Sequence, residues 1–174
     1  MRRKSLEDAT CPIARSLESI GEWWSLLIVR DAFRGKRRFG EFQKSVGLAK
    51  NILAARLRKL VACGIFRLEP ASDGSRYQEY VLTEKGRALG MVVMSLRFWG
   101  TRWAFGDGWE TPVVRDRATG EEVVGIGFRT CSGRLVSPAD LEFTVSAARP
   151  SKKAGARATM RTSAPADPTQ RHDR

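Results

Sequence analysis

The sequence contains few of the residues from which proteins build metal centres and nucleophilic active sites. Its 174 residues include one histidine, His172, and three cysteines, Cys11, Cys63 and Cys131, none of them in a Cys-x-x-Cys pair. A structural zinc site needs about four nitrogen or sulfur ligands, and many hydrolase and metalloenzyme mechanisms depend on histidine. We therefore expect no metal ion, no cofactor and no enzymatic activity.

Long apolar runs are also missing. No stretch of 18 apolar residues is present, so we expect no membrane-spanning helix, and the first ten residues, MRRKSLEDAT, lack the apolar core of a secretory signal. Three scattered cysteines do not make a disulfide framework, which favours a reducing compartment. The sequence thus predicts a cytoplasmic protein with no membrane partner.

Acidic residues are scarce relative to basic ones. Lys and Arg number 31 against 19 Asp and Glu, which gives a formal charge of +12 and a pI of about 10.5. Such a charge favours a polyanionic partner, nucleic acid or anionic lipid, without specifying a fold. The 42% of hydrophobic residues is enough for a packed core.

Four helices are predicted in the first third of the chain. The second, Glu22 to Phe33, is apolar almost all round and is expected at the buried centre of a small domain, with Trp23 and Trp24 packing rather than forming a ligand cage. A minimal strand is expected at Phe39. The other three helices run from Pro12 to about Ile20, from Gly40 to Val46, and from about Lys50 to Cys63.

The fourth of these helices, ILAARLRKLVACGIF, has an unusual polar face. Leu53, Leu57, Leu60 and Val61 form an apolar seam. The opposite face carries only small, amide and basic side chains, whereas a solvated face usually mixes acids and bases. This face could bind a polyanion, and the alternative interpretation is an ordinary solvated surface. The residues of this face are Asn51, Ala55, Arg58 and Ala62, flanked by Ala54 and Lys59.

After Gly64 the periodicity changes from helix to strand. Residues 65–69 and 76–82 predict two strands joined by the turn 70–75, in which Asp73-Gly74 is a strong hairpin signal. Thr83 is expected to cap one long helix that reaches about Trp103. Its apolar stripe is expected to hold two copies together, the alternative being ordinary core. The stripe comprises Leu89, Val92, Val93, Leu96, Trp99, Gly100 and Trp103.

This order of elements predicts a mainly α fold with a small β wing, the winged helix-turn-helix. Its second motif helix enters the major groove, where Asn51 could pair with adenine and the small Ala54 and Ala55 allow close approach. The hairpin would supply further cations, and the basic turn before the motif could hold the backbone. The predicted DNA-binding residues are Lys36, Arg37, Arg38, Lys50, Asn51, Ala54, Ala55, Arg56, Arg58, Lys59, Arg67 and Arg76.

Several stretches resemble the HxlR family of bacterial winged-helix transcriptional regulators. They are Cys11–Ala14, Ile20–Arg30, Arg38–Phe42, Leu53–Leu60 with Gly64-Ile65, and Tyr80–Gly86. The resemblance implies a cytoplasmic, sequence-specific DNA-binding regulator. It would be a homodimer, paired through its first and last helices, on a palindromic operator.

The sequence departs from the family pattern in two places. Ala49 stands where the family often has a Ser or Thr that caps the recognition helix, a cap typically worth about 1 kcal/mol. The segment from Trp109 resembles a tail of some members in which a zinc-ribbon-like outline survives without its cysteines. Only Cys131 remains there, so no metal is expected.

We expect four parts along the chain. Residues 1–10 are a polar arm and 11–105 the DNA-binding and dimerisation domain. Residues 109–148 are a small β-rich segment of short strands and turns. Residues 149–174 lack apolar periodicity and predict a basic, disordered tail.

Cys11 is a candidate sensor of oxidants or electrophiles. It directly precedes Pro12 at the start of the first helix, where free N–H groups and the helix dipole favour a thiolate. Some members of the resembled family use a cysteine at this position for sensing. The alternatives are a regulator that responds to a small ligand without cysteine chemistry, or a less specific nucleic-acid-binding protein. An RNA-binding module and a small enzyme with a pocket in 109–145 are weaker rivals.

Overall fold

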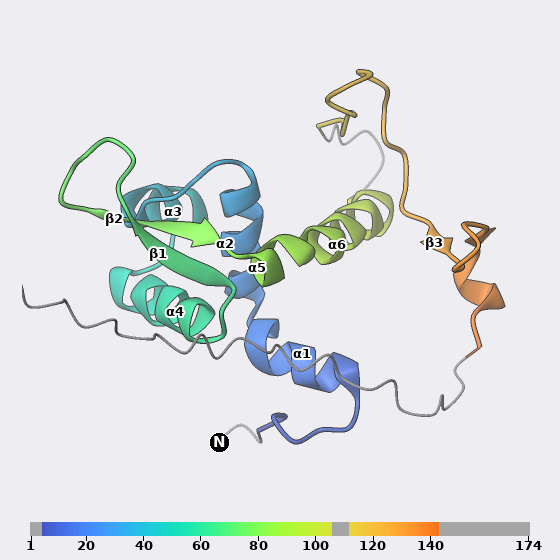
Figure 1. Ribbon diagram of the computed structural model, residues 1–174, viewed down its shortest axis with the longest axis horizontal. Helices are drawn as coiled ribbons and strands as arrows, with labels where there is room; N and C mark the ends of the chain where they lie inside the picture. The colour runs from blue at the N-terminus through green and yellow to red at the C-terminus, as the bar shows by residue number, and fades with distance from the viewer. Residues whose placement is uncertain (1–4, 106–111, 143–174) are drawn as a thin grey trace, which may run out of the picture. The chain divides into compact units, whose positions relative to one another are not determined.

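The computed structural model describes residues 5–105 and 112–142 (Figure 1). The chain divides between Gly127 and Phe128 into two compact units. The predicted tail 149–174 and the break at 106–108 lie outside the described residues. The described helices of the first unit are α1 (Pro12–Ile20), α2 (Trp23–Phe33), α3 (Phe39–Val46), α4 (Lys50–Ala62), α5 (Glu84–Ala88) and α6 (Gly90–Trp103), and its hairpin strands are β1 (Phe66–Pro70) and β2 (Gln78–Leu82).

The first unit is a winged helix-turn-helix, as the sequence predicted. Helices α2, α3 and α4 pack with the antiparallel hairpin β1–β2 around one apolar core. The rings of Phe42, Phe66 and Tyr80 meet edge to face at centroid distances of 6.2–6.3 Å. The other main core residues are Ile28, Val29, Leu53, Leu57, Leu60 and Ile65.

Helix boundaries follow the residues expected to set them. Gly47 and Gly64 end α3 and α4 with φ of 74° and 69°, a left-handed conformation that glycine adopts without steric cost. Thr83 caps α5, since its hydroxyl accepts a hydrogen bond from the Gly86 N–H at 3.1 Å. The same hydroxyl donates to the Gly64 carbonyl at 2.6 Å, which ties the end of α4 to the start of α5.

Helix α2 is buried on one side only, which corrects the expectation that it is buried all round. Ile28 and Val29 are fully buried, whereas Trp23 is 74% exposed. An apolar sequence does not specify which face the core covers, and here the core covers Ser25 in the first turn of α2 but leaves Trp23 exposed.

The strand expected at Phe39 is absent, because Phe39 is the first residue of α3. Glu41 accepts hydrogen bonds from the Arg37 and Arg38 N–H groups, both at 2.8 Å, and so fixes the helix start. The strand-like contact of this segment lies two residues earlier, where the Tyr80 N–H donates to the Arg37 carbonyl at 2.8 Å.

The single helix predicted over residues 84–103 is also wrong, since it is divided at Leu89 into α5 and α6. The Leu89 N–H bonds to the Gly86 carbonyl at 3.1 Å, a tighter turn than an α-helix makes. Two close approaches accompany the break. A Cβ on Gly90 would lie 3.3 Å from the Phe33 ring, and one on Gly86 would lie 2.2 Å from the Ile65 carbonyl oxygen.

Residues 112–142 contain short pairings and turns. In the first unit, the backbones of Arg115 and Glu122 form an isolated antiparallel β-bridge around a turn that ends at Gly120. In the second unit, β3 (Phe128–Arg129) pairs with β4 (Leu135–Val136), and a 3-10 turn, η1 (Pro138–Asp140), follows. Within the described ranges 5–105 and 112–142, no helix is long and apolar enough to cross a membrane.

Candidate nucleic-acid interface

Helix α4 presents the polar face that its sequence predicts. Its seam residues Leu53, Leu57 and Leu60 are fully buried, which turns the acid-free side outward. Asn51, Ala55, Arg58 and Ala62 are all exposed, and Ala54 is half-buried. The side chain of Ala49 makes no capping bond at the start of the helix, so the departure from the family pattern leaves the first turn of α4 without a side-chain acceptor.

Arg58 and Arg76 are the cations with the freest side chains in this region. Both side chains are exposed. Within the part of the chain that the structure describes, neither of them has a hydrogen-bond or ion-pair partner. Lys50 is likewise exposed at the first turn of α4. Because no acid of the described residues pairs with Lys50, Arg58 or Arg76, these three side chains are available to phosphates or base edges.

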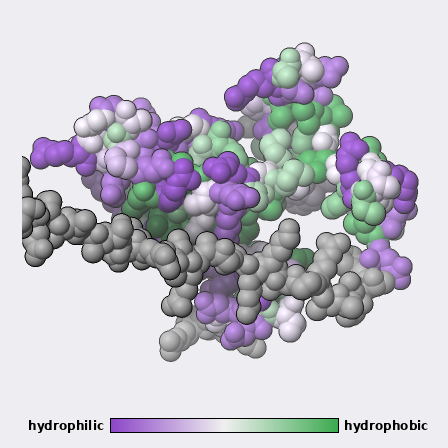
Figure 2. Space-filling view, viewed as in Figure 1, coloured by the Kyte–Doolittle hydropathy of each residue, from purple (hydrophilic) through white to green (hydrophobic). Residues whose placement is uncertain are grey.

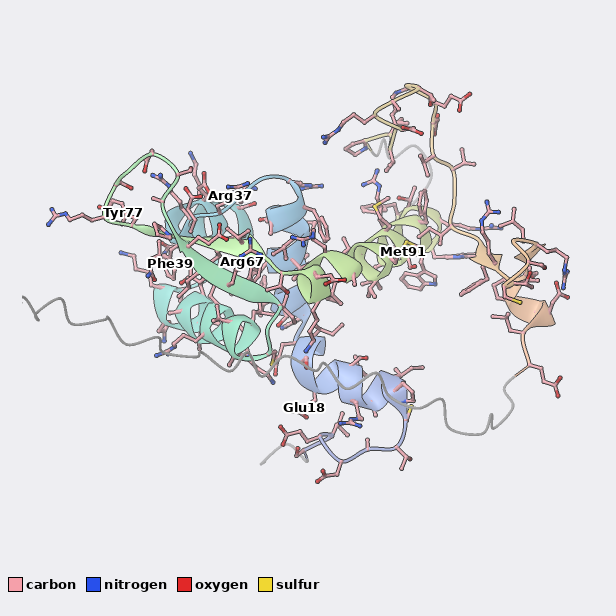
Figure 3. All side chains as sticks on the ribbon, in the orientation of Figure 1. Glu18, Arg37, Phe39, Arg67, Tyr77 and Met91 are labelled. Carbon is pink, nitrogen blue, oxygen red and sulfur yellow. The ribbon has the colours of Figure 1, made fainter. Side chains whose placement is uncertain are left out.

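Two other cations of α4 are tied to the first two helices. Arg56 Nη2 lies 3.2 Å from Glu22 Oε2, and Lys59 Nζ lies 3.7 Å from Glu18 Oε1; Glu18 comes from α1 (Figure 3). The sequence placed Arg56, Arg58 and Lys59 together among the predicted DNA-binding residues. The structure places only Arg58 on the exposed side without a partner.

The basic turn between α2 and α3 is anchored on a buried carboxylate. Asp31 is fully buried and pairs with Arg30 at 2.9 Å and with Lys36 Nζ at 3.6 Å. Burial acts to raise the pKa of Asp31, but hydrogen bonding and the charges of Arg30 and Lys36 outweigh it, so the pKa lies below its ordinary value. Lys36 Nζ also donates to the Ser45 hydroxyl at 2.7 Å.

Arg37 and Arg38 face two acids of the wing, Asp73 and Glu79, that the sequence did not assign to the interface. Arg38 Nη2 lies 2.6 Å from Asp73 Oδ2 and 3.6 Å from Glu79 Oε1, and Arg37 Nη1 lies 3.6 Å from Glu79 Oε2. Glu79 is only 4% exposed. The hydrogen bond from Arg38 holds the pKa of the Asp73 carboxyl well below its usual range. Glu79 lies 41 positions after Arg38 in the sequence, so no local pattern signals that the two residues pair.

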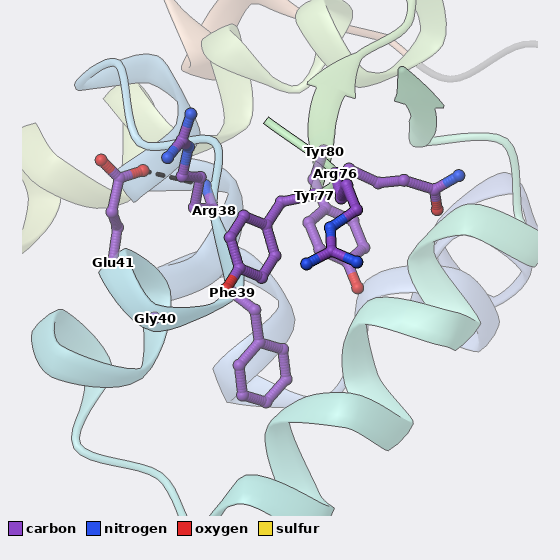
Figure 4. A pocket seen from close by; sticks show the side chains of 8 residues that line it. Arg38, Phe39, Gly40, Glu41, Arg76, Tyr77 and Tyr80 are labelled. Carbon is purple, nitrogen blue, oxygen red and sulfur yellow. Dashed lines mark hydrogen bonds between the residues drawn. The ribbon is translucent and has the colours of Figure 1, made fainter. Parts of the chain in front are cut away.

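A cleft of about 900 Å³ separates the start of α3 from the wing (Figure 4). It brings two arginines together with three aromatic rings, of which Tyr77 is 71% exposed. On the other side of the hairpin, Arg67 Nε donates to Glu69 at 2.6 Å. The residues lining the cleft are Arg38, Phe39, Gly40, Glu41, Arg76, Tyr77, Gln78 and Tyr80.

A profile described as HxlR-like helix-turn-helix matches residues 19–107, about half of the chain. The chain belongs to the HxlR-like helix-turn-helix family. This confirms the resemblance drawn from the sequence.

Among curated relatives of this HxlR-like chain is the HTH-type transcriptional regulator Rv3095 of Mycobacterium tuberculosis. It is 43% identical over 91 residues, which are 52% of this chain and 58% of the relative. The regulator YdeP of Bacillus subtilis is 32% identical over 94 residues, 53% of this chain and 73% of the relative. The chain thus spans a little more than half the length of the mycobacterial relative.

Two solved structures are similar over most of the chain. The crystal structure of PA1607, described as a candidate transcription factor, shares 46% identity at a TM-score of 0.75 and covers 82% of this chain and 100% of that one. The structure of PA1374 from Pseudomonas aeruginosa, described in the same way, shares 38% identity at a TM-score of 0.56 and covers 80% of this chain and 94% of that one. Both similarities extend beyond the residues that the family profile matches.

The HxlR-like chain also exposes an apolar surface along α6, which Figure 2 shows as a gathering of hydrophobic residues. Leu89 and Val93 of the predicted stripe pack against the core, whereas the rest of it faces outward. On α1, Ile13 is 71% exposed and Cys11, its N-cap residue, is exposed too. The exposed large residues of α6 are Met91, Val92, Leu96, Trp99 and Trp103.

Proposed function

We propose that this HxlR-like chain is a transcriptional regulator that binds duplex DNA sequence-specifically as a homodimer. The observation that carries the proposal is the outward face of α4, which is free of acids and presents Asn51, Ala55 and Arg58 to solvent. A helix of this kind fits the major groove with its first turns at the base edges. The family membership supports the same function.

Within this proposal the predicted DNA-binding residues divide into two groups. Asn51, with Ala54 and Ala55, reads base edges, because an amide can pair with adenine and small side chains accept a thymine methyl. Lys50, Arg58 and Arg76 contact phosphates. The cations that are paired within the protein act mainly by holding the reading elements in place. They are Lys36, Arg37, Arg38, Arg56, Lys59 and Arg67.

The exposed stripe of α6, together with α1, is proposed to pair two copies. Three exposed residues carry this step: Leu96, Trp99 and Trp103 are 49%, 61% and 65% exposed. Side chains of this size are usually covered in a stable protein. Two-fold pairing places two recognition helices about one helical turn apart, so half-sites should be centred about 10 bp apart on a palindromic operator.

The function is tested by recovering bound fragments from a genomic library and then titrating a recovered duplex against a scrambled one and an RNA of the same length. The proposal expects a palindrome and a clear preference for the recovered duplex. Equal affinity for all three would favour the alternative of a less specific nucleic-acid-binding protein. If the Asn51→Ala variant discriminates less between the recovered and the scrambled duplex but keeps its non-specific affinity, base readout is assigned to Asn51.

Control of DNA binding through Cys11 is a second, separable proposal. The thiol is exposed at the N-cap of α1, next to exposed Ile13 on the proposed pairing surface. Modification there would alter how the two copies meet and hence how the recognition helices are spaced. The test is a DNA shift with Cys63→Ser/Cys131→Ser protein, with and without diamide or an aldehyde. Binding that neither reagent changes would leave the alternative of a small-ligand-responsive regulator.

A further inference from the structure

The wing is joined to the start of α3 by a network of acids and arginines. Asp73 comes from the loop between the strands and Glu79 from β2, whereas Arg37 and Arg38 immediately precede α3. Figure 4 shows Arg38 and Arg76 in the same cleft. The sequence assigned Arg37 and Arg38 to the DNA backbone, whereas both are paired with these acids.

Glu79 is the centre of this network. Its carboxylate is 4% exposed and accepts hydrogen bonds from the Ser72 N–H at 3.3 Å and the Ser72 hydroxyl at 3.1 Å. Both arginines lie 3.6 Å from its oxygens. A buried carboxylate that lost these cations would be left partly uncompensated, which is strongly unfavourable. Arg37 and Arg38 therefore have a structural reason to remain on Glu79.

Asp73 adds a second, exposed link. Its carboxylate lies 2.6 Å from Arg38 Nη2. The same carboxylate accepts a hydrogen bond from the Ser75 N–H, two residues on, at 3.0 Å. One guanidinium thus joins the wing loop to the first residues before α3. The backbone adds a third link, since the Tyr80 N–H donates to the Arg37 carbonyl at 2.8 Å. These three links, two of which share the Arg38 guanidinium, fix the hairpin against the helix-turn-helix motif.

Arg76 stands outside the network although it lines the same cleft. Its side chain is exposed and has no partner in the described chain, and the neighbouring Tyr77 is 71% exposed. A free guanidinium beside an exposed aromatic ring suits a backbone phosphate and its sugar.

We propose that Asp73 and Glu79 clamp Arg37 and Arg38, so that these four residues position the wing and Arg76 makes its contact with the DNA backbone. Arg37 and Arg38 are then positioning residues rather than phosphate ligands. This inference rests on the proposed function, because it assumes that the wing meets duplex DNA.

The Asp73→Asn substitution separates the two roles by the sign of its effect. If Arg38 positions the wing, D73N loosens the loop and weakens binding, by about tenfold if the Arg76 contact is lost. The salt dependence then becomes shallower by about one phosphate per protomer. If Arg38 is a phosphate ligand restrained by Asp73, D73N frees it, so that binding tightens and the salt dependence becomes steeper.

A matched control is available on the same hairpin. Glu69→Gln removes the same charge from β1, where Glu69 lies opposite Glu79 in the hairpin register but pairs with Arg67 rather than with Arg37 or Arg38. It reports the general effect of one acid fewer near DNA, which is a modest tightening. A double-mutant cycle of R38Q and D73N completes the test. The clamp predicts that the double variant binds no more weakly than R38Q alone.

Hydroxyl-radical footprinting of the recovered duplex shows which contact with the DNA is lost. The clamp predicts that D73N removes protection where the wing contacts the backbone and keeps it where α4 lies. Tightening by D73N, no change in affinity, or additive losses in the cycle would each overturn the proposal.

Amide exchange in the free protein tests the clamp without DNA. D73N should accelerate exchange of the Ser72 and Ser75 N–H groups and leave α4 unchanged, whereas unchanged exchange in the loop would overturn it. If the wild-type protein binds no duplex specifically, the proposed function fails, and the exchange experiment still decides whether the clamp exists.

Discussion

At the scale of single residues, the structure divides cations that look alike in the sequence. Arg56 and Arg58 lie two positions apart on α4, yet Arg56 pairs with Glu22 at 3.2 Å and Arg58 is exposed without a partner in the described chain. Charge at a position does not tell which neighbour the fold brings to it. The exposure of α4 could be predicted from its seam, but the pairing could not, because Glu22 is 34 positions away.

Arg58→Ala and Arg56→Ala should therefore act on different properties. R58A is expected to weaken DNA binding and make the slope of log K against log salt shallower by about 2 for two protomers, since each loses one phosphate contact. R56A should lower the free energy of unfolding by about 1 kcal/mol or less, because the partly exposed ion pair with Glu22 is lost. Salt-dependent titrations and denaturant unfolding measure the two. Equal effects of both variants on the salt slope would contradict this division.

A glycine offers a second residue-scale prediction. A Cβ on Gly86 would lie 2.2 Å from the Ile65 carbonyl oxygen and 2.9 Å from Leu82 Cδ2, so Gly86→Ala must shift α5 away from β2. We expect a loss of about 1–3 kcal/mol in the free energy of unfolding. Gly40→Ala is the matched control, since nothing lies within 4 Å of its Cβ position in α3. Equal stability of the two variants would show that α5 packs less closely than described.

At the scale of elements, α6 is a helix whose apolar side the described chain leaves largely uncovered. Leu96→Glu or Trp99→Glu would place an unpaired charge in the proposed pairing surface, at a cost of about 3 kcal/mol or more. The dimer dissociation constant should rise by about a hundredfold or more. Sedimentation velocity measures it, with Ala88→Glu on the exposed side of α5 as the control. A folded L96E protein that remains a dimer at the same concentration would exclude α6 from the interface.

Most of the elements could be predicted because their signals are local. Gly47, Gly64 and Thr83 set helix ends through backbone conformation and capping, which depend on a few neighbouring residues. The predictions failed where a distant contact decides. Phe33 meets Gly90 where the predicted long helix divides, and Arg37 rather than Phe39 pairs with β2. The acids of the clamp were missed for the same reason.

At the scale of the whole molecule, four carboxyl groups make the free energy of unfolding depend on pH. Asp31, Glu41, Asp73 and Glu79 have pKa values below their ordinary 3.8 and 4.5. Their folded forms release protons more readily than the unfolded chain, so the stability that they add is present above the ordinary values. It is lost as pH falls through the lower, folded values.

The free energy of unfolding should accordingly fall as the pH is lowered below about 5. In the Glu41→Gln variant the free energy of unfolding should fall less steeply with falling pH. The Arg38 and Arg37 N–H groups, which lower the pKa of Glu41, would then face an amide that does not titrate. Denaturant unfolding at a series of pH values from neutral into the acid range measures both slopes. Parallel curves for wild type and E41Q would contradict the role given to this carboxyl.

The proposed function requires that two copies of this HxlR-like chain bind one palindromic duplex through α4. The most direct measurement is a titration of a recovered genomic duplex at several salt concentrations, with stoichiometry read from the same curves. We expect two protomers per duplex and, for about eight phosphates neutralised by the pair, a slope of log K against log salt of about −7. A slope near zero, or the same affinity for a scrambled duplex, would contradict it.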